Sequence, residues 1–241
     1  MEIHIYKDKQ ETIREYARFF IDEGNKAIKT KGNFNAVLSG GSSPKAVFEL
    51  LTTEEFKDQL DWTKVFFFFG DERNVPADHT DFNGLMAAKA LFEPLNISEN
   101  QIFYVNTSLA PEEAAKDYME SIRKHFPGKN IVFDLIMLGL GDDSHTASLF
   151  PYTKVLNEQG VDIKSNYLPE KEIFRITMTA SMINQAKAIG FLVYGENKAA
   201  AVKTILNGEP DTQKYPAQLI KPASGICHWF LDKGSASDLK S

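Results

Sequence analysis

Val65-Phe66-Phe67-Phe68-Phe69 is apolar at every position, and the charged stretch Gly70-Asp71-Glu72-Arg73 follows it directly. A strand with apolar side chains on both faces is typical of a parallel sheet that helices cover on both sides. We therefore expect residues 65–69 to form a central strand of such a sheet rather than an edge strand. The charged residues would then lie at the carboxyl end of a buried strand.

Strand patterns alternate with helix patterns over most of the chain. This order predicts βαβ units, with right-handed crossovers that place helices on both faces of a parallel sheet. We predict an α/β protein with a three-layer, Rossmann-like fold and a mostly parallel central sheet, formed by residues 1–241 as a single domain. The strands are expected at 3–6, 34–38, 65–69, 132–138, 174–179, 189–194 and 226–231. The helices are expected around Ile13, Ala17, Phe20 and Ala27, which recur at helical spacing, and at 44–51, 83–92, 111–125 and 197–206.

Two segments interrupt this alternation. Residues 152–172 are polar and lack periodicity, so we expect them to form a small excursion from the domain. Residues 207–224 are rich in proline, lysine and polar residues, which predicts a loop. Neither segment carries a repeat or a low-complexity tract.

The charge and cysteine content exclude several classes of protein. The 241 residues include 27 Lys and Arg against 33 Asp and Glu, a net charge of −6, which argues against a nucleic-acid binder. Cys227 is the sole cysteine, so no internal disulfide can form, as is typical of a reducing compartment. No apolar run reaches the length of a membrane span, and residues 1–9 do not resemble a signal peptide. We expect a cytoplasmic protein without nucleic-acid or membrane partners.

Three unusual polar stretches each begin directly after a predicted strand. Ligands of open α/β sheets bind outside the carboxyl ends of the strands, so these stretches should converge on one site. The first is Ser39-Gly40-Gly41-Ser42-Ser43-Pro44. Its glycines allow a tight turn, Ser42 or Ser43 can cap the next helix, and Pro44 suits the first helical position. A phosphate bound at this helix N-terminus and an ordinary strand-to-helix turn are both consistent with the pattern.

The second polar stretch is Asp71-Glu72-Arg73. Three charged residues at the carboxyl end of a buried strand lower the stability of the fold unless they are solvated, paired or functional. Asp71 is a candidate to orient a base or substrate, and Arg73 is a candidate to bind an oxyanion or phosphate. A surface turn with a local ion pair is the alternative. His79 and Asn83 follow closely enough to reach the same cleft, although His79 fits an ordinary loop residue better.

The third polar stretch is residues 139–151, which begins Gly139-Leu140-Gly141-Asp142-Asp143-Ser144-His145. Ser144 stands where a dinucleotide fingerprint needs its third glycine, so we reject that interpretation. His145 is a candidate general base, because an ordinary imidazole titrates near pH 6.5, and Asp142 or Asp143 could set its tautomer. A histidine satisfied within a turn is the alternative. No second histidine lies at a ligand spacing, so we predict no metal here.

Two further cations are candidates for the same site, and the sequence argues against a serine or a cysteine nucleophile. Arg175 lies near the start of a predicted strand and Lys198 follows another, and either could reach the same phosphate. Taken alone, each also fits an ordinary surface charge. The chain has no Gly-x-Ser-x-Gly elbow for a serine nucleophile. Cys227 and His228 are neighbours on a predicted strand and so point to opposite faces, which favours a buried Cys227 without a catalytic role.

Together these stretches resemble the family of glucosamine-6-phosphate isomerases and 6-phosphogluconolactonases. The run from Asp143 to Pro151 is the most specific match. Moderate matches are residues 39–44, 71–76 with His79 and Asn83, 175–177, and Gly195 with Lys198 and Ala199. The resemblance implies a three-layer α/β fold. It also implies hydrolysis of 6-phosphoglucono-δ-lactone to 6-phosphogluconate in the oxidative pentose phosphate pathway, with no cofactor or metal.

The residues after His145 separate the two branches of this family. The deaminases continue with Asn-Glu-Pro, whose glutamate is catalytic, whereas this chain continues Ser148-Leu149-Phe150-Pro151 without a carboxylate. This difference favours the lactonase branch. Two residues differ from the usual pattern of the family. Where the family usually has glycine this chain has Ser144, which lowers stability by about 1 kcal/mol if its φ is positive. Where the family often has serine this chain has Phe82.

The expected roles follow from this resemblance and the chemistry of each residue. His145 would act as general base on the attacking water, and Asp71 or Asp143 would orient it. Arg73 or backbone N–H groups would stabilise the oxyanion. The phosphate would bind Gly40, Gly41, Ser42, Ser43, Arg175 and Lys198. A glucosamine-6-phosphate deaminase and a non-catalytic sugar-phosphate-binding module are the alternatives, and the sequence leaves the oligomeric state open.

Overall fold

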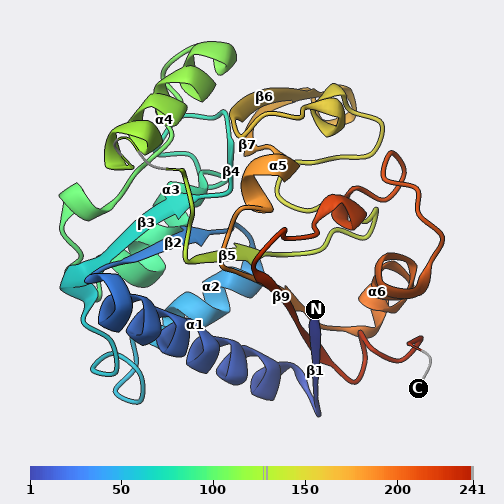
Figure 1. The fold of residues 1–241 in the computed structure, drawn as a ribbon, viewed down its shortest axis with the longest axis horizontal. Helices are drawn as coiled ribbons and strands as arrows, with labels where there is room; N and C mark the ends of the chain where they lie inside the picture. Colours follow the sequence, from blue (N-terminus) through green and yellow to red (C-terminus); the bar gives the residue numbers. More distant parts are fainter. Residues whose placement is uncertain (127, 129, 240–241) are drawn as a thin grey trace.

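The computed structural model describes residues 1–126, 128 and 130–239. Its largest sheet has six strands in the order β1-β9-β8-β5-β2-β3, and every pairing within it is parallel (Figure 1). This arrangement confirms the predicted α/β fold with a parallel central sheet. The strands are β1 (Glu2–Tyr6), β2 (Phe34–Leu38), β3 (Val65–Phe69), β5 (Leu135–Leu138), β8 (Ala188–Val193) and β9 (Ile226–Asp232).

Helices cover both faces of this sheet. One core cluster joins one face to α1 (Lys9–Lys31), α2 (Ser42–Leu51) and α3 (Asn83–Ala87), which a π-helical turn (Ala88–Phe92) extends. A second cluster joins the other face to α4 (Pro111–His125), α5 (Ala180–Ile183) and α6 (Ala199–Asn207). Figure 1 shows α1 and α2 on the opposite side of the sheet from α4. The three predicted layers are therefore present.

The first helix shows how local sequence sets an element. Asp8 caps α1 by accepting a hydrogen bond from the Glu11 amide, and Gly32 ends the helix with a φ of 88°. Its buried stripe includes the four apolar residues predicted from their spacing, Ile13, Ala17, Phe20 and Ala27. Within the described part of the chain, no helix combines the length and the apolar character that crossing a membrane requires.

The prediction that residues 65–69 form a central strand is wrong. β3 is the last strand of the sheet, although its side chains are buried on both faces except for the half-buried Phe66. The free edge of β3 is covered locally, since the amide of Phe103 donates to the carbonyl of Phe67 at 2.9 Å. Phe67 also packs on Phe92, and Phe68 stacks on Phe103. Aromatic burial on both faces therefore does not require a second neighbouring strand.

A second, antiparallel sheet was not predicted. It has the order β4-β7-β6, with β4 (Asp71–Arg73), β6 (Ile163–Leu168) and β7 (Ile173–Met178). β7 is the strand expected at 174–179, so its assignment to the parallel sheet is wrong. β6 lies within the excursion 152–172, which contributes a strand rather than irregular chain alone. The β4–β7 pairing joins segments far apart in sequence, which no local pattern indicates. β6 and β7 instead form a local hairpin, which the polar, aperiodic residues 152–172 did not predict.

Candidate active site

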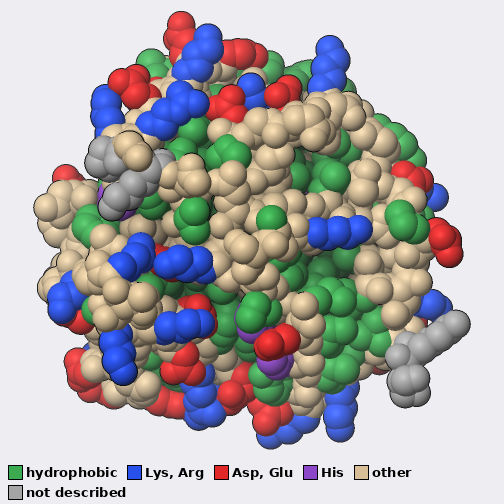
Figure 2. Space-filling model, in the orientation of Figure 1, with side chains coloured by type: hydrophobic (Ala, Val, Ile, Leu, Met, Phe, Trp, Pro, Cys, Tyr) green, Lys and Arg blue, Asp and Glu red, His purple; other side chains and the backbone are tan. Residues whose placement is uncertain are grey.

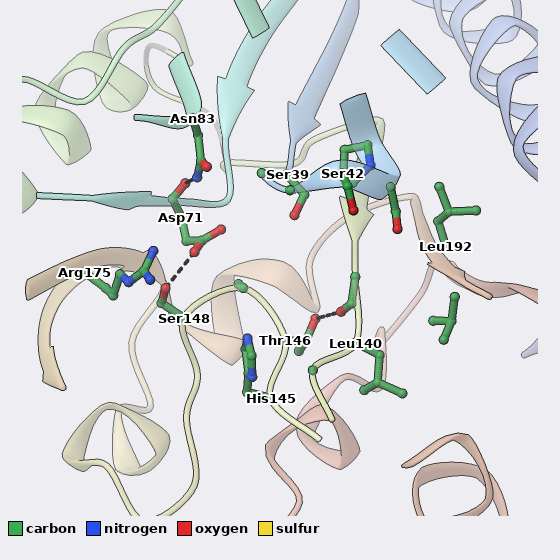
Figure 3. A pocket seen from close by; sticks show the side chains of 18 of the residues that line it. Ser39, Ser42, Asp71, Asn83, Leu140, His145, Thr146, Ser148, Arg175 and Leu192 are labelled. Atoms are coloured by element: carbon green, nitrogen blue, oxygen red, sulfur yellow. Dashed lines mark hydrogen bonds between the residues drawn. The ribbon is translucent and has the colours of Figure 1, made fainter. Parts of the chain in front are cut away.

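A cleft of about 370 Å³ opens at the carboxyl ends of the parallel strands. Figure 3 shows Asp71 and Arg175 on one side of it, Ser39 and Ser42 on another, and His145 reaching in from the third polar stretch. The three stretches therefore converge as the sequence predicted. Of the ten predicted site residues, nine line the cleft: Gly40, Gly41, Ser42, Ser43, Asp71, Arg73, His145, Arg175 and Lys198. The tenth, Asp143, contacts His145.

The glycine loop, residues 39–43, presents backbone donors rather than a side-chain cap. Gly41 is the residue that precedes α2, its φ is 103°, and no side chain in the described part of the chain caps the helix. The predictions that Ser42 or Ser43 would cap the helix and that Pro44 would open it are wrong, because the helix already begins at Ser42. A helix without a cap leaves its first N–H groups without intrahelical acceptors, and these groups can bind an anion.

Gly40 allows this loop to approach the second polar stretch closely. A Cβ atom on Gly40 would lie 1.8 Å from Oδ1 of Asn83, which no side chain can tolerate without movement. Asn83 in turn donates from Nδ2 to the backbone oxygen of Asp71 at 2.9 Å. A glycine at position 40 therefore allows the loop after β2 to pack against Asn83, which is itself bonded to β4.

Asp143 is the carboxylate that contacts the imidazole of His145. Its Oδ1 lies 2.5 Å from Nδ1 of His145, and it also accepts from the His145 amide at 3.2 Å. Burial opposes ionisation of Asp143, but these hydrogen bonds outweigh it and hold its pKa below the ordinary value. With Nδ1 assigned as the protonated nitrogen, Nε2 keeps a free lone pair. The ring also stacks on Phe150 with centroids 4.0 Å apart, which fixes its plane.

Asp71, the other aspartate considered for that role, has a different partner. The buried Asp71 accepts a hydrogen bond from Oγ of Ser148 at 2.6 Å. Ser148 also accepts at its backbone oxygen from Nδ2 of Asn166 in β6, at 2.9 Å. Asp71 thus joins the second polar stretch to the third. Sequence reasoning did not single out Ser148, although it lies within the most specific motif.

Arg73 and Arg175 form a pair of cations on neighbouring strands. They lie directly opposite each other in the β4–β7 register. The Nε atoms of both are buried and have no hydrogen-bond partner among the described residues, while Nη1 of Arg73 donates to the backbone oxygen of Asp81. Burial and, next, the charge of Arg73 lower the pKa of Arg175. Two adjacent guanidinium groups with free donors favour binding of an anion such as phosphate.

Glu72 points away from the cleft and has a structural role. The alternation along β4 buries its carboxylate completely, where it accepts from the amides of Arg73, Asn83 and Gly84 at 2.8 to 3.0 Å. Burial raises the pKa of Glu72 to about 8 against the effect of these hydrogen bonds. The alternative of a surface turn with a local ion pair is wrong for this residue. Glu72 instead holds the start of α3 against β4.

Two lysines line the cleft. Lys198 lines it, but its Nζ is already 2.7 Å from Asp142 and donates to the backbone oxygen of Leu140. Lys198 therefore anchors the loop that carries His145. Lys171, which sequence reasoning missed, lines the cleft with its Nζ 4.9 Å from the centre of the Phe150 ring. Lys171 belongs to the excursion 152–172, and no local signal marks it.

The backbone around His145 is in an unfavourable conformation. Ser144 has a φ of 66° and Ala147 a φ of 48°, both in the left-handed region. The cost expected for Ser144 depended on a positive φ, and the structure shows that its φ is positive.

Outside this loop, Cys227 is buried as expected, and burial raises the pKa of its thiol to about 11.

Known proteins share both the sequence and the fold of this chain. The family described as glucosamine-6-phosphate isomerases/6-phosphogluconolactonase matches residues 7–229. The 6-phosphogluconolactonase of Synechocystis sp. is 39% identical over 219 residues, which cover 89% of this chain and 88% of the relative. That of Haemophilus influenzae is 36% identical over 82% of this chain and 84% of its own. The solved structure of the Trypanosoma brucei 6-phosphogluconolactonase has a TM-score of 0.88 at 28% identity, and the match covers 99% of this chain and 98% of that one.

Proposed function

Because the chain belongs to the family of glucosamine-6-phosphate isomerases and 6-phosphogluconolactonases, we propose that it hydrolyses 6-phospho-D-glucono-1,5-lactone to 6-phospho-D-gluconate. The observation that carries this proposal is the His145–Asp143 pair, which opens onto a cleft lined by two guanidinium groups with free donors. The cleft therefore combines a base with an anion site, which are the two functions that hydrolysis of a phosphorylated lactone needs.

The phosphate of the lactone binds the glycine loop and the arginine pair. Backbone N–H groups at the start of α2 and the hydroxyls of Ser42 and Ser43 donate to it, and Arg73 and Arg175 neutralise its charge. Lys198 contributes through the position of the loop that it anchors. Fixing the phosphate places the distant ring in one orientation, and this lowers the entropic part of the barrier.

His145 transfers the proton. Nε2 removes a proton from a water molecule whose oxygen forms a bond with C1 of the lactone. The bond between C1 and the ring oxygen then breaks, and the imidazolium returns the proton to that oxygen. Asp143 stabilises the imidazolium between these steps. Because Arg73 lies beside Arg175 at the phosphate, we assign the developing oxyanion to backbone N–H groups of the cleft.

The deaminase alternative needs a further acid–base group that this loop does not offer. Ser148, Leu149 and Phe150, which follow the histidine motif, carry no carboxylate. Release of ammonia from glucosamine 6-phosphate would reveal that activity, and binding without turnover would reveal a sensor. A cytoplasmic location and the absence of nucleic-acid partners stay predictions.

The proposal is tested by hydrolysis of freshly prepared lactone, followed by acid release at a pH where spontaneous opening is slow. We expect rapid turnover by the wild type and a loss of kcat on the order of 10³-fold in His145→Ala, with little change in KM. His125→Gln serves as the control, because His125 ends α4 and contacts Asn35 near the start of β2, away from the cleft.

Two results would contradict the proposal. A wild-type rate equal to the spontaneous rate would exclude the lactonase activity. A near-normal kcat in His145→Ala would leave the activity but remove the general base.

A further inference from the structure

A second group of polar side chains lies at the opposite end of the central sheet. Glu2 and His4 are alternate residues of β1, so their side chains lie on the same face. His228 of β9 is paired with Glu2 in the parallel register. Since Glu2 begins its strand, this end of the sheet is the one remote from the cleft. Nothing in the proposed lactonase reaction uses these three residues.

Their side-chain atoms converge on one point. Nε2 of His4 lies 3.3 Å from Nδ1 of His228, which lies 3.2 Å from Oε2 of Glu2, and the third side of the triangle is 3.8 Å. Ligands held about 2.0–2.1 Å from a tetrahedral Zn²⁺ are separated by about 3.3 Å. The three separations are therefore close to those of one face of a zinc coordination tetrahedron.

Aromatic packing holds the two imidazole rings in place. His4 stacks on Phe230 with centroids 4.9 Å apart, and His228 packs on Phe19 of α1 at 4.7 Å. The Glu2 side chain is half exposed, which leaves the outer side open for a water ligand. Figure 2 shows histidine and acidic side chains together at the surface near the start of β1. A site of this kind is already arranged before the ion binds.

We propose that Glu2, His4 and His228 bind a divalent transition-metal ion of the zinc class, with water as the fourth ligand. Two imidazoles and one carboxylate are donors that suit Zn²⁺ better than Mg²⁺ or Ca²⁺, which prefer oxygen ligands. The ion joins β1, which is the edge strand of the sheet that the described residues form, to β9. Its role is to fasten this edge of the sheet. The alternative is a ring N–H···N hydrogen bond between the histidines, with Glu2 as their ion-pair partner.

The test is a Zn²⁺ titration of the untagged, metal-stripped chain by calorimetry, with thermal unfolding measured alongside. The His145→Gln background removes the imidazole that contacts Asp143 in the cleft, a second place where Zn²⁺ could bind. We expect one tightly bound Zn²⁺ and a rise in Tm of several degrees at about hundredfold excess over Kd. Co²⁺ in place of Zn²⁺ should show the intense visible absorption of a tetrahedral site.

Variants of two of the ligands separate the metal site from general effects on folding. In the same background, His4→Gln and Glu2→Gln should each weaken Zn²⁺ binding at least tenfold and, at the same Zn²⁺ concentration, reduce the rise in Tm to about half or less, while circular dichroism stays unchanged. His79→Gln, which removes an exposed histidine elsewhere, should bind as the parent does. Equal Zn²⁺ affinity in the parent and in His4→Gln would overturn the proposal. So would the absence of both saturable binding and a rise in Tm.

Discussion

The glycine loop (residues 39–43) and the histidine loop (residues 139–151) both follow a parallel strand and line the same cleft, yet they are built in opposite ways. The glycine loop has no side-chain cap and offers its backbone to a ligand. The histidine loop is tied down by side chains: Thr146 donates to Gly139, Ser148 to Asp71, and Lys198 reaches Asp142. An anion site needs open donors, whereas a general base needs a fixed orientation.

The two loops also differ in which parts of the molecule support them. The glycine loop depends on its own glycines and on contact with Asn83. The histidine loop depends on β4 through Asp71, on β6 through Asn166, and on the residues before α6 through Lys198. Substitutions in the histidine loop should therefore change kcat, and substitutions in the glycine loop should change KM.

The largest effect is expected for Asp143→Asn. An amide N–H directed at Nδ1 favours the tautomer that protonates Nε2, so the base is lost while the fold remains. We expect kcat to fall by about 10²- to 10⁴-fold, with KM changed little. The neighbouring Asp142→Asn is the matched control and should lose far less activity. Equal losses of kcat in the two variants would show that the negative charge of the loop, rather than the hydrogen bond to His145, supports catalysis.

A smaller effect, on KM rather than on kcat, is expected for Gly40→Ala. The added methyl group meets Asn83 and displaces the loop, so phosphate contacts weaken and KM should rise about tenfold, the equivalent of 1.4 kcal/mol. Gly32→Ala is the control. Its φ is positive, but nothing lies within 4 Å, so it should lower stability by about 1 kcal/mol and leave KM unchanged. A normal KM in folded Gly40→Ala would remove this loop from phosphate binding.

The smallest effect is expected for Ser144→Gly. Glycine relieves the positive φ, but it also gains freedom in the unfolded chain, so the free energy of unfolding should rise by less than about 1 kcal/mol. Urea denaturation measures this change. Ser181→Gly in α5 has no such strain to relieve and should lower stability instead. If both variants are destabilised alike, the conformation of Ser144 carries no cost.

Most helices and strands of the central sheet could be predicted from the sequence. The expected strands 34–38 and 65–69 and the helix 111–125 have the observed bounds. The strand expected at 132–138 begins only at Leu135. The order of the strands could be predicted less well, because the apolar pattern of residues 65–69 predicts a central strand whereas these residues form an edge strand. Burial of both faces is visible in a sequence, but the identity of the neighbours along an edge is not.

The sequence by itself determined the fold class, the three polar stretches after strands, and the histidine at their centre, because these depend on local periodicity and on the shared carboxyl end of a parallel sheet. The tertiary structure alone decided that Asp143 rather than Asp71 contacts His145, that Arg73 lies opposite Arg175, and that Lys171 reaches the cleft. Each of these depends on strand register, side-chain direction or a contact between distant segments. Such relations are set by packing of the whole chain, and no short stretch of residues encodes them.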